Sequence, residues 1–166
     1  MRSSLVVEGY PLVLEHTRLP YVSYPFEWSG EMLRAAALHT LALLEELSTH
    51  GLTLKDAHGW NVLFQGCEPV FVDFGSIVEA PAGEPWQKYV EQEFRECFLH
   101  PLELLAAGHG RIVRALMRDF DRGISAAECQ SLLTAAGRTL PAMDQTLPFT
   151  WYREHLSALV LPSASL

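Results

Sequence analysis

The sequence has 166 residues, 49% hydrophobic and 19% charged, which fits one globular domain and excludes an intrinsically disordered chain. Its formal net charge of −8 argues against nucleic acid or an anionic membrane surface as the main partner. Three widely spaced cysteines, Cys67, Cys97 and Cys129, predict neither a disulfide framework nor a zinc site. Because no apolar run resembles a signal peptide or a membrane span, we expect a cytoplasmic protein.

The first half of the chain predicts a β-rich stretch, one long helix and a hairpin. Between Leu5 and Tyr24, short apolar runs alternate with glycine and proline, which favours one or two strands. Ser29 suits an N-cap and Gly51 can follow a helix C-terminus. A helix is predicted over about residues 30–50, because apolar residues recur at helical spacing: Leu33, Ala37, Leu41, Leu44 and Leu47. The runs NVLF and PVFVDF, joined by QGCEP, predict two brief strands and a tight turn.

Four further helices are predicted toward the carboxyl end. Pro101 should bend or divide the first of them, because proline lacks an N–H and its ring collides with the preceding turn. Ser125, with Glu128 three residues later, is a capping-box signature at the start of the third. An acidic set in the first helix is predicted to be a solvated face: Glu91, Glu93 and Glu96. The helices span about residues 86–107, 111–121, 125–137 and 150–159.

The residues that point to chemistry lie in one window, LKDAHGWNVLF followed by QGCEPVFVDFGS. Asp56 is followed five residues later by Asn61, and the predicted hairpin then returns the chain to Asp73. Phosphoryl transfer needs a carboxylate that orients or deprotonates a hydroxyl, and oxygen ligands that hold Mg²⁺ against nucleotide phosphates. The spacing therefore indicates a phosphotransfer site. The alternative is that the three residues are turn and cap residues of an ordinary hairpin.

The same window resembles the catalytic and metal-binding loops of the protein-kinase and aminoglycoside-phosphotransferase fold, whose pattern is H-x-D-x-x-x-x-N followed by D-F-G. The resemblance implies a carboxy-terminal kinase lobe with Asp56 as catalytic base. It implies that Asn61 and Asp73 bind Mg²⁺. Together with Phe74 and Gly75, these two residues would form the part of the site that holds ATP.

Two neighbouring positions qualify this resemblance. Leu54 stands where the family has its histidine, so the usual internal bracing of the catalytic loop is missing. Lys55 lies next to the expected base and is assigned a catalytic role, steadying the transferred phosphate; the alternative is an exposed ion-pair partner.

A second resemblance covers most of the chain, from HTRLPYVSY through VDFGS and on to PWQKYVEQEFRECFLHPLELLAAG. These segments are similar to the amino-terminal, kinase-like portion of bacterial proteins described as nodulation-type class I SAM-dependent methyltransferases. In those relatives a methyltransferase domain follows downstream. Because no glycine-rich strand–turn–helix for the methionine cofactor follows here, we recognise no SAM site and do not expect methyl transfer by this chain alone.

The groups that a complete kinase places over the nucleotide are not found in this sequence. No lysine precedes Lys55, and Gly108-His109-Gly110 is followed by Val113 where a G-x-G-x-x-G loop needs its third glycine. We therefore expect a mostly helical α+β fold, a truncated kinase-like C-lobe with a small β-hairpin, an N-terminal strand remnant and no complete N-lobe. The expected division is an N-lobe or hinge remnant at 1–28, the lobe at 29–160 and a frayed tail at 161–166.

Function follows from this incomplete site. We expect a kinase-like module with a Mg²⁺–ATP site that is either inactive, as a pseudokinase, or dependent on a protein partner that supplies the missing lobe. The alternative is a non-catalytic accessory subunit of a methyltransferase that modifies a glycan or natural product. A homo-oligomer is compatible with either, whereas nucleic acid and membrane partners are not expected.

Overall fold

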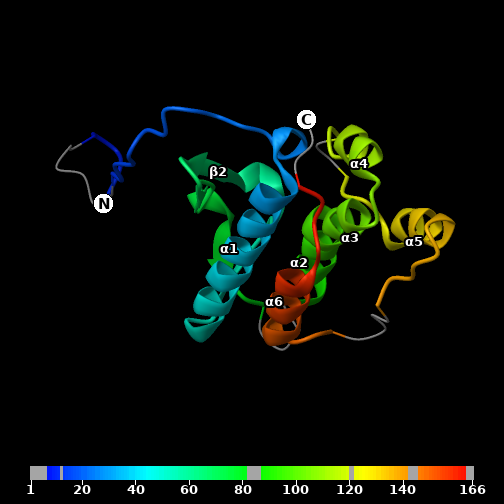
Figure 1. Cartoon of the computed structure of the whole chain (residues 1–166). Coiled ribbons are helices and arrows are strands. Elements are labelled where there is room, and N and C mark those ends of the chain that lie inside the picture. Colours follow the sequence, from blue (N-terminus) through cyan, green and yellow to red (C-terminus); the bar gives the residue numbers. More distant parts are fainter. Residues whose placement is uncertain (1–6, 12, 82–86, 120–121, 142–145, 164–166) are drawn as a thin grey trace.

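The computed structural model describes residues 7–11, 13–81, 87–119, 122–141 and 146–163. They form an α+β fold in which helices take up about half of the chain and two small antiparallel sheets account for the strands. Figure 1 shows helix α1 (Gly30–Thr49) and helix α6 (Phe149–Ala158) lying side by side, with the strands on one side of this pair and helices α4 (Gly110–Leu116) and α5 (Ala126–Ala135) on the other. The predicted α+β class is confirmed.

Helix α1 follows the sequence prediction closely. Ser29 accepts a hydrogen bond from the Met32 amide, as an N-cap should. After the helix, Gly51 adopts a positive φ of 68°, a conformation that costs glycine little. The apolar stripe of α1 is buried against the strands, α6 and helix α3 (His100–Ala106), so this helix forms one wall of the main core.

The predicted hairpin is also present. Strand β2 (Val62–Gln65) pairs antiparallel with strand β3 (Glu68–Phe71), and Gly66 in the turn has a φ of 65°. A second sheet was not predicted: strand β1 (Leu52–Leu54) pairs antiparallel with strand β4 (Ile77–Glu79). These three-residue strands carry too short a pattern to be recognised from sequence.

Pro101 acts on its helix in a specific way. Helix α2 (Gln87–Phe94) continues through a π-helical turn, η4 (Arg95–Leu99), into helix α3 (His100–Ala106). Proline has no N–H for the carbonyl four residues earlier, and its ring would collide with that carbonyl, so widening the preceding turn removes the conflict. The predicted division is therefore a π-turn inside one continuous helical run.

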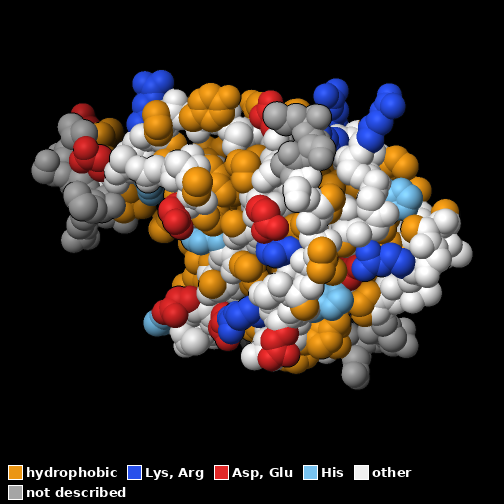
Figure 2. Space-filling view, in the orientation of Figure 1, with side chains coloured by type: hydrophobic (Ala, Val, Ile, Leu, Met, Phe, Trp, Pro, Cys, Tyr) orange, Lys and Arg blue, Asp and Glu red, His pale blue; other side chains and the backbone are white. Residues whose placement is uncertain are grey.

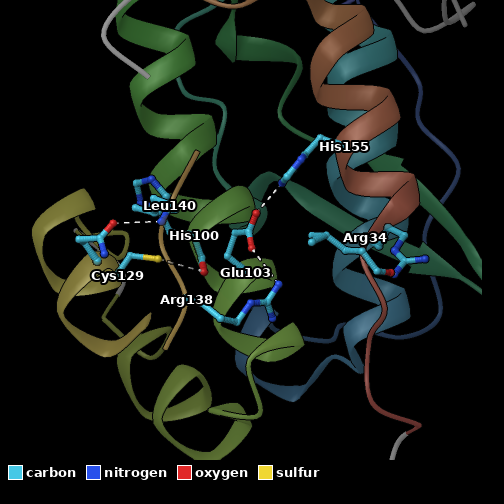
Figure 3. Close-up of polar contacts among 9 residues, drawn as sticks. Arg34, His100, Glu103, Cys129, Arg138, Leu140 and His155 are labelled. Atoms are coloured by element: carbon cyan, nitrogen blue, oxygen red, sulfur yellow. Dashed lines mark hydrogen bonds and ion pairs between the residues drawn. The ribbon is translucent and has the colours of Figure 1, made fainter. Parts of the chain in front are cut away.

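The remaining helices pack around α3. Helix α4 (Gly110–Leu116) is shorter than predicted, whereas helix α5 (Ala126–Ala135) begins with the expected Ser125–Glu128 capping box. In Figure 3, the buried carboxylate of Glu103 on α3 reaches His155 on α6 and Arg138 beyond α5. This polar connection joins three separate parts of the chain.

The amino-terminal stretch departs from prediction. Residues 7–11 and 13–24 contain no strand apart from an isolated bridge at Leu14, and the segment extends away from the helices (Figure 1). Tyr10, Tyr21 and Val22 are exposed, so β-propensity alone did not produce a strand where the described residues offer no partner to pair with. The predicted strand remnant is wrong for these residues; residues 1–6 lie outside the described ranges.

The carboxyl end of the described chain is packed against α1. Leu161 lies so close to Gly30 that an added Cβ there would be 3.3 Å from Leu161 Cδ1. Residues 164–166, the rest of the predicted frayed tail, lie outside the described ranges. None of the helices among the described residues is both long and apolar enough to span a membrane.

Candidate functional site

Two loops carry the predicted site residues. One joins β1 to β2 and holds Asp56 and Asn61; the other joins β3 to β4 and holds Asp73. Because β1 pairs with β4 while β2 pairs with β3, the two loops run side by side between the sheets. The pairing of strands therefore brings residues that are far apart in sequence into one region.

Ser76 ties the two loops together. Its buried Oγ accepts a hydrogen bond from the Asp56 amide at 2.9 Å and donates one to the Asp56 carbonyl at 3.1 Å. The Lys55 amide donates to the Ser76 carbonyl at 2.7 Å, which extends the β1–β4 pairing by one residue. The Ser76 side chain therefore positions the backbone of the expected base.

Asn61 adds a second link. Its Nδ2 donates to the Asp56 carbonyl at 3.1 Å, while its own carbonyl accepts from the Val72 amide at 2.9 Å. The side chain is largely buried, so one face of the amide is committed to holding the loop. Among the described residues no donor is assigned to its Oδ1, which leaves an oxygen available as a ligand.

The side-chain carboxylates of Asp56 and Asp73 do not hold the loops by hydrogen bonds, as the side chains of Ser76 and Asn61 do. The Asp56 side chain is 40% exposed, and its ion partner is the exposed Lys55, whose Nζ lies 4.0 Å from Oδ2. Asp73 occupies the N-cap position of the short 3-10 turn η3 (Phe74–Ser76), yet its side chain makes no capping hydrogen bond. Neither carboxylate accepts a hydrogen bond from another described residue, unlike typical cap residues.

The residues after Asp73 leave this side of the site open. Phe74 is 59% exposed, with its ring centroid 6.3 Å from that of His16. A Cβ at Gly75 would lie 3.3 Å from Asp73 Oδ1, so glycine gives that carboxylate room. On the other side, Trp60 packs with Tyr24 and Phe26 to form an aromatic wall beside Asn61.

Glu93 is a site-adjacent residue that sequence patterns did not identify. It reaches from α2 to accept a hydrogen bond from the Ala57 amide. Burial raises the pKa of its carboxyl above the ordinary value; the Ala57 hydrogen bond and His58 oppose this rise, and Asp56 adds to it. The prediction of a solvated acidic face is therefore wrong at this position.

Glu91, from the same acidic set, is likewise inside the structure. Its Oε1 accepts hydrogen bonds from Arg95, from the Tyr152 hydroxyl and from the Leu147 amide. Both acidic side chains meet partners that lie far away in sequence, and helical periodicity carries no signal for such contacts.

Replacing Glu93 with glutamine should flatten part of the pH dependence of stability. Because the folded state raises the pKa of Glu93, its contribution is most favourable below the ordinary value of 4.5 and is lost as pH rises through the folded pKa. Glutamine stays neutral and keeps an oxygen for the Ala57 amide. Unfolding free energies measured across this range should therefore fall less steeply with rising pH in Glu93→Gln than in the wild type.

The control for this experiment is Glu68→Gln, which removes the same charge from an exposed position on β3. Its profile should run parallel to that of the wild type. A Glu93→Gln profile that also runs parallel would show that burial of this carboxyl does not contribute to the pH dependence.

The donor set suits one kind of metal ion. Among the described residues, no group of three or more His, Cys, Asp and Glu side chains is arranged to hold a metal. Asp56, Asn61 and Asp73 instead offer two carboxylates and one amide, all oxygen donors. Mg²⁺ is commonly bound by one or two carboxylates, with substrate phosphates and water completing its octahedron. This set fits Mg²⁺ with a phosphate ligand better than it fits zinc or calcium.

Comparison with known proteins gives one partial match. Over 92 residues, or 55% of the chain, the sequence is 44% identical to Nodulation protein NoeA of Rhizobium meliloti (strain 1021). The match covers 19% of that protein, so the chain spans about a fifth of the relative's length. No protein-family model matches the chain. No solved structure matches it either, so the comparisons give the kinase-like fold no support.

Proposed function

We propose that this chain is a kinase-like module in which Asn61 and Asp73 hold Mg²⁺ with the phosphates of ATP, and Asp56 faces the acceptor hydroxyl. The observation that carries the proposal is that the backbone at the site is held by hydrogen bonds, whereas the Asp56 and Asp73 carboxylates are not. Ser76 and Asn61 fix the backbone around Asp56, while the Asp56 and Asp73 carboxylates take no part in the hydrogen bonding of the described residues. Because the backbone is held and the exposed Lys55 is the ion partner of Asp56 alone, the two carboxylates are suited to bind a ligand.

Each residue has a separate task in this proposal. Bound Mg²⁺ would neutralise charge on the phosphates. Asp73 and the Asn61 amide oxygen would be its protein ligands, and the hydrogen bond from Asn61 Nδ2 to the Asp56 carbonyl orients that amide. Asp56, half exposed, would orient the acceptor hydroxyl and take its proton.

The proposed site needs groups that the 166 residues do not contain. A lysine and loop amides over the phosphates supply much of the orientation on which phosphoryl transfer depends. We propose that another chain, or another part of the same protein, supplies them. Without those groups, the module is expected to bind Mg²⁺–ATP weakly and to turn it over slowly or not at all.

The test is the thermal stability of the chain with ATP in the presence of Mg²⁺ or of EDTA. A ligand that binds only the folded state raises the free energy of unfolding by about 2.7 kcal/mol at one hundred times its Kd. Mg²⁺–ATP should therefore raise the melting temperature, and Asp73→Asn should abolish the increase. Asp56→Asn should keep the increase and lose any turnover that a completing partner confers.

Glu68→Gln serves as the charge-matched control, because it lies on the same hairpin but outside the site. It should behave like the wild type. A melting temperature that stays constant up to millimolar Mg²⁺–ATP would contradict the proposal. A Mg²⁺-dependent increase that survives in Asp73→Asn would contradict it equally.

A second candidate is an accessory role beside a methyltransferase, as the nodulation-type resemblance suggests. The match to Nodulation protein NoeA favours it, because the aligned segment is a small part of a much longer protein. This role requires no nucleotide. It predicts that adding Mg²⁺–ATP leaves the melting temperature unchanged, both in the wild type and in Asp73→Asn. The same experiment therefore separates the two candidates.

A further inference from the structure

A cavity of about 640 Å³ lies at the N-terminal end of α1. It is open to solvent and is lined by the beginning of α1, by α4 and the exposed residues just after it, and by Pro162 and Ser163 near the carboxyl end. Small-molecule sites typically measure about 300–1,000 Å³, so the cavity can hold a metabolite-sized ligand. None of the residues assigned to the candidate phosphotransfer site lines it.

Three arginines dominate this cavity. Arg111 and Arg114 lie one helical turn apart on α4, and Arg118 follows the helix; all three line the cavity. No aspartate or glutamate is among the described lining residues, and neither Arg111 nor Arg114 forms an ion pair with a described residue. Figure 2 shows Lys and Arg side chains projecting at the α4 end of the molecule. A chain with a net charge of −8 thus gathers positive charge around one hollow.

The beginning of α1 adds to this positive field. Ser29 and Gly30 line the cavity, so the positive end of the 20-residue helix dipole lies there, although the Met32 amide is already bonded to Ser29 Oγ and the Leu33 amide to the Ser29 carbonyl. Gly108 and Gly110, the two glycines of the incomplete G-x-G pattern, line it as well and bring backbone without side chains to its wall. Arg118 is held by its contact with the Phe26 ring, 5.2 Å from the centroid.

We propose that this cavity binds a phosphorylated small molecule. Guanidinium groups match phosphate oxygens in paired hydrogen bonds, and a doubly charged phosphate offers acceptors to more than one arginine at once. The positive end of the α1 dipole favours the same anion. The flexible alkyl stems of the arginines and Leu105 provide an apolar wall for the organic part.

The test is calorimetric titration of the whole 166-residue chain with inorganic pyrophosphate at fixed ionic strength, with EDTA present so that no Mg²⁺ site contributes. The wild type should bind it. Arg111→Gln and Arg114→Gln should each weaken binding by about tenfold, because each removes a charge-assisted hydrogen-bonding pair. Arg18→Gln, an exposed arginine in the amino-terminal segment, is the charge-matched control and should bind like the wild type.

Four outcomes would overturn the proposal: no binding by the wild type, equal weakening by Arg18→Gln, unchanged binding in Arg111→Gln and Arg114→Gln, or citrate binding as tightly as pyrophosphate. The last would indicate a carboxylate site instead. Asp73→Asn should bind pyrophosphate normally under these conditions. The failure of this proposal and the failure of the proposed Mg²⁺–ATP site therefore give different results.

Discussion

Replacing His155 with phenylalanine is expected to lower the free energy of unfolding by about 3 kcal/mol. The Glu103 side chain is only 4% exposed, and His155 Nε2 lies 2.5 Å from its Oε1. Phenylalanine keeps a ring that can stack on Trp151, as the imidazole does at 4.7 Å, but it cannot hydrogen-bond to the carboxylate. Arg138, which is half exposed, remains as an ion partner of Glu103, with Nη2 3.9 Å from Oε2. The expected loss of stability therefore lies at the lower end of the range for broken buried ion pairs.

Urea unfolding of matched variants checks this prediction. His50 forms a similar His–Glu pair with Glu46, but both side chains are exposed, so His50→Phe should cost less than about 0.5 kcal/mol. Adding Glu103→Met to His155→Phe should recover part of the loss, because it removes the buried charge left without its partner. Equal effects of His155→Phe and His50→Phe would show that burial of Glu103 does not set the strength of the contact.

Substituting alanine for Gly123 should be similarly damaging, at about 3 kcal/mol. A Cβ there would lie 2.5 Å from Glu96 Cβ and 2.6 Å from the Glu96 carbonyl carbon. The obstacle is the backbone of the π-turn, which cannot move aside as a flexible side chain can. The segment is also anchored on both sides of Ile124, whose amide donates to the Glu96 carbonyl at 2.9 Å and whose carbonyl contacts His100 Nδ1 at 2.6 Å.

Gly110→Ala provides the comparison, because a Cβ at this first position of α4 would make an ordinary contact, 3.6 Å from Leu105 Cδ2. Reduced freedom of the unfolded chain should make that variant neutral or more stable, by up to about 1 kcal/mol. The free energies of unfolding of the two variants, measured by urea titration, should therefore differ by about 3 to 4 kcal/mol. Closely similar values would mean that the 123–124 segment can move away from the π-turn.

The candidate site was only partly accessible from sequence. The spacing of Asp56, Asn61 and Asp73 placed them on neighbouring loops, and the structure links those loops through hydrogen bonds to the Asp56 backbone. Whether they bind Mg²⁺–ATP stays a prediction. The part played by Glu93 had no local signal, because its partner, the Ala57 amide, lies 36 residues away.

Local patterns determined much of this protein's secondary structure. Caps, proline and apolar periodicity act within one or two helical turns, so α1, the β2–β3 hairpin, the capping box of α5 and the extent of α6 could be derived from sequence. The expected strands near the amino terminus failed for the complementary reason. A strand depends on a partner, and β-propensity does not supply one.

Only the tertiary structure decided which distant residues meet. It paired β1 with β4, turned Ser76 into the link between two loops, and gathered the arginines of α4 at the start of α1. It also buried Glu103 between His155 and Arg138. Contacts of this kind depend on how packed elements cross in space, and their energy comes from burial and desolvation that no local pattern of residues records.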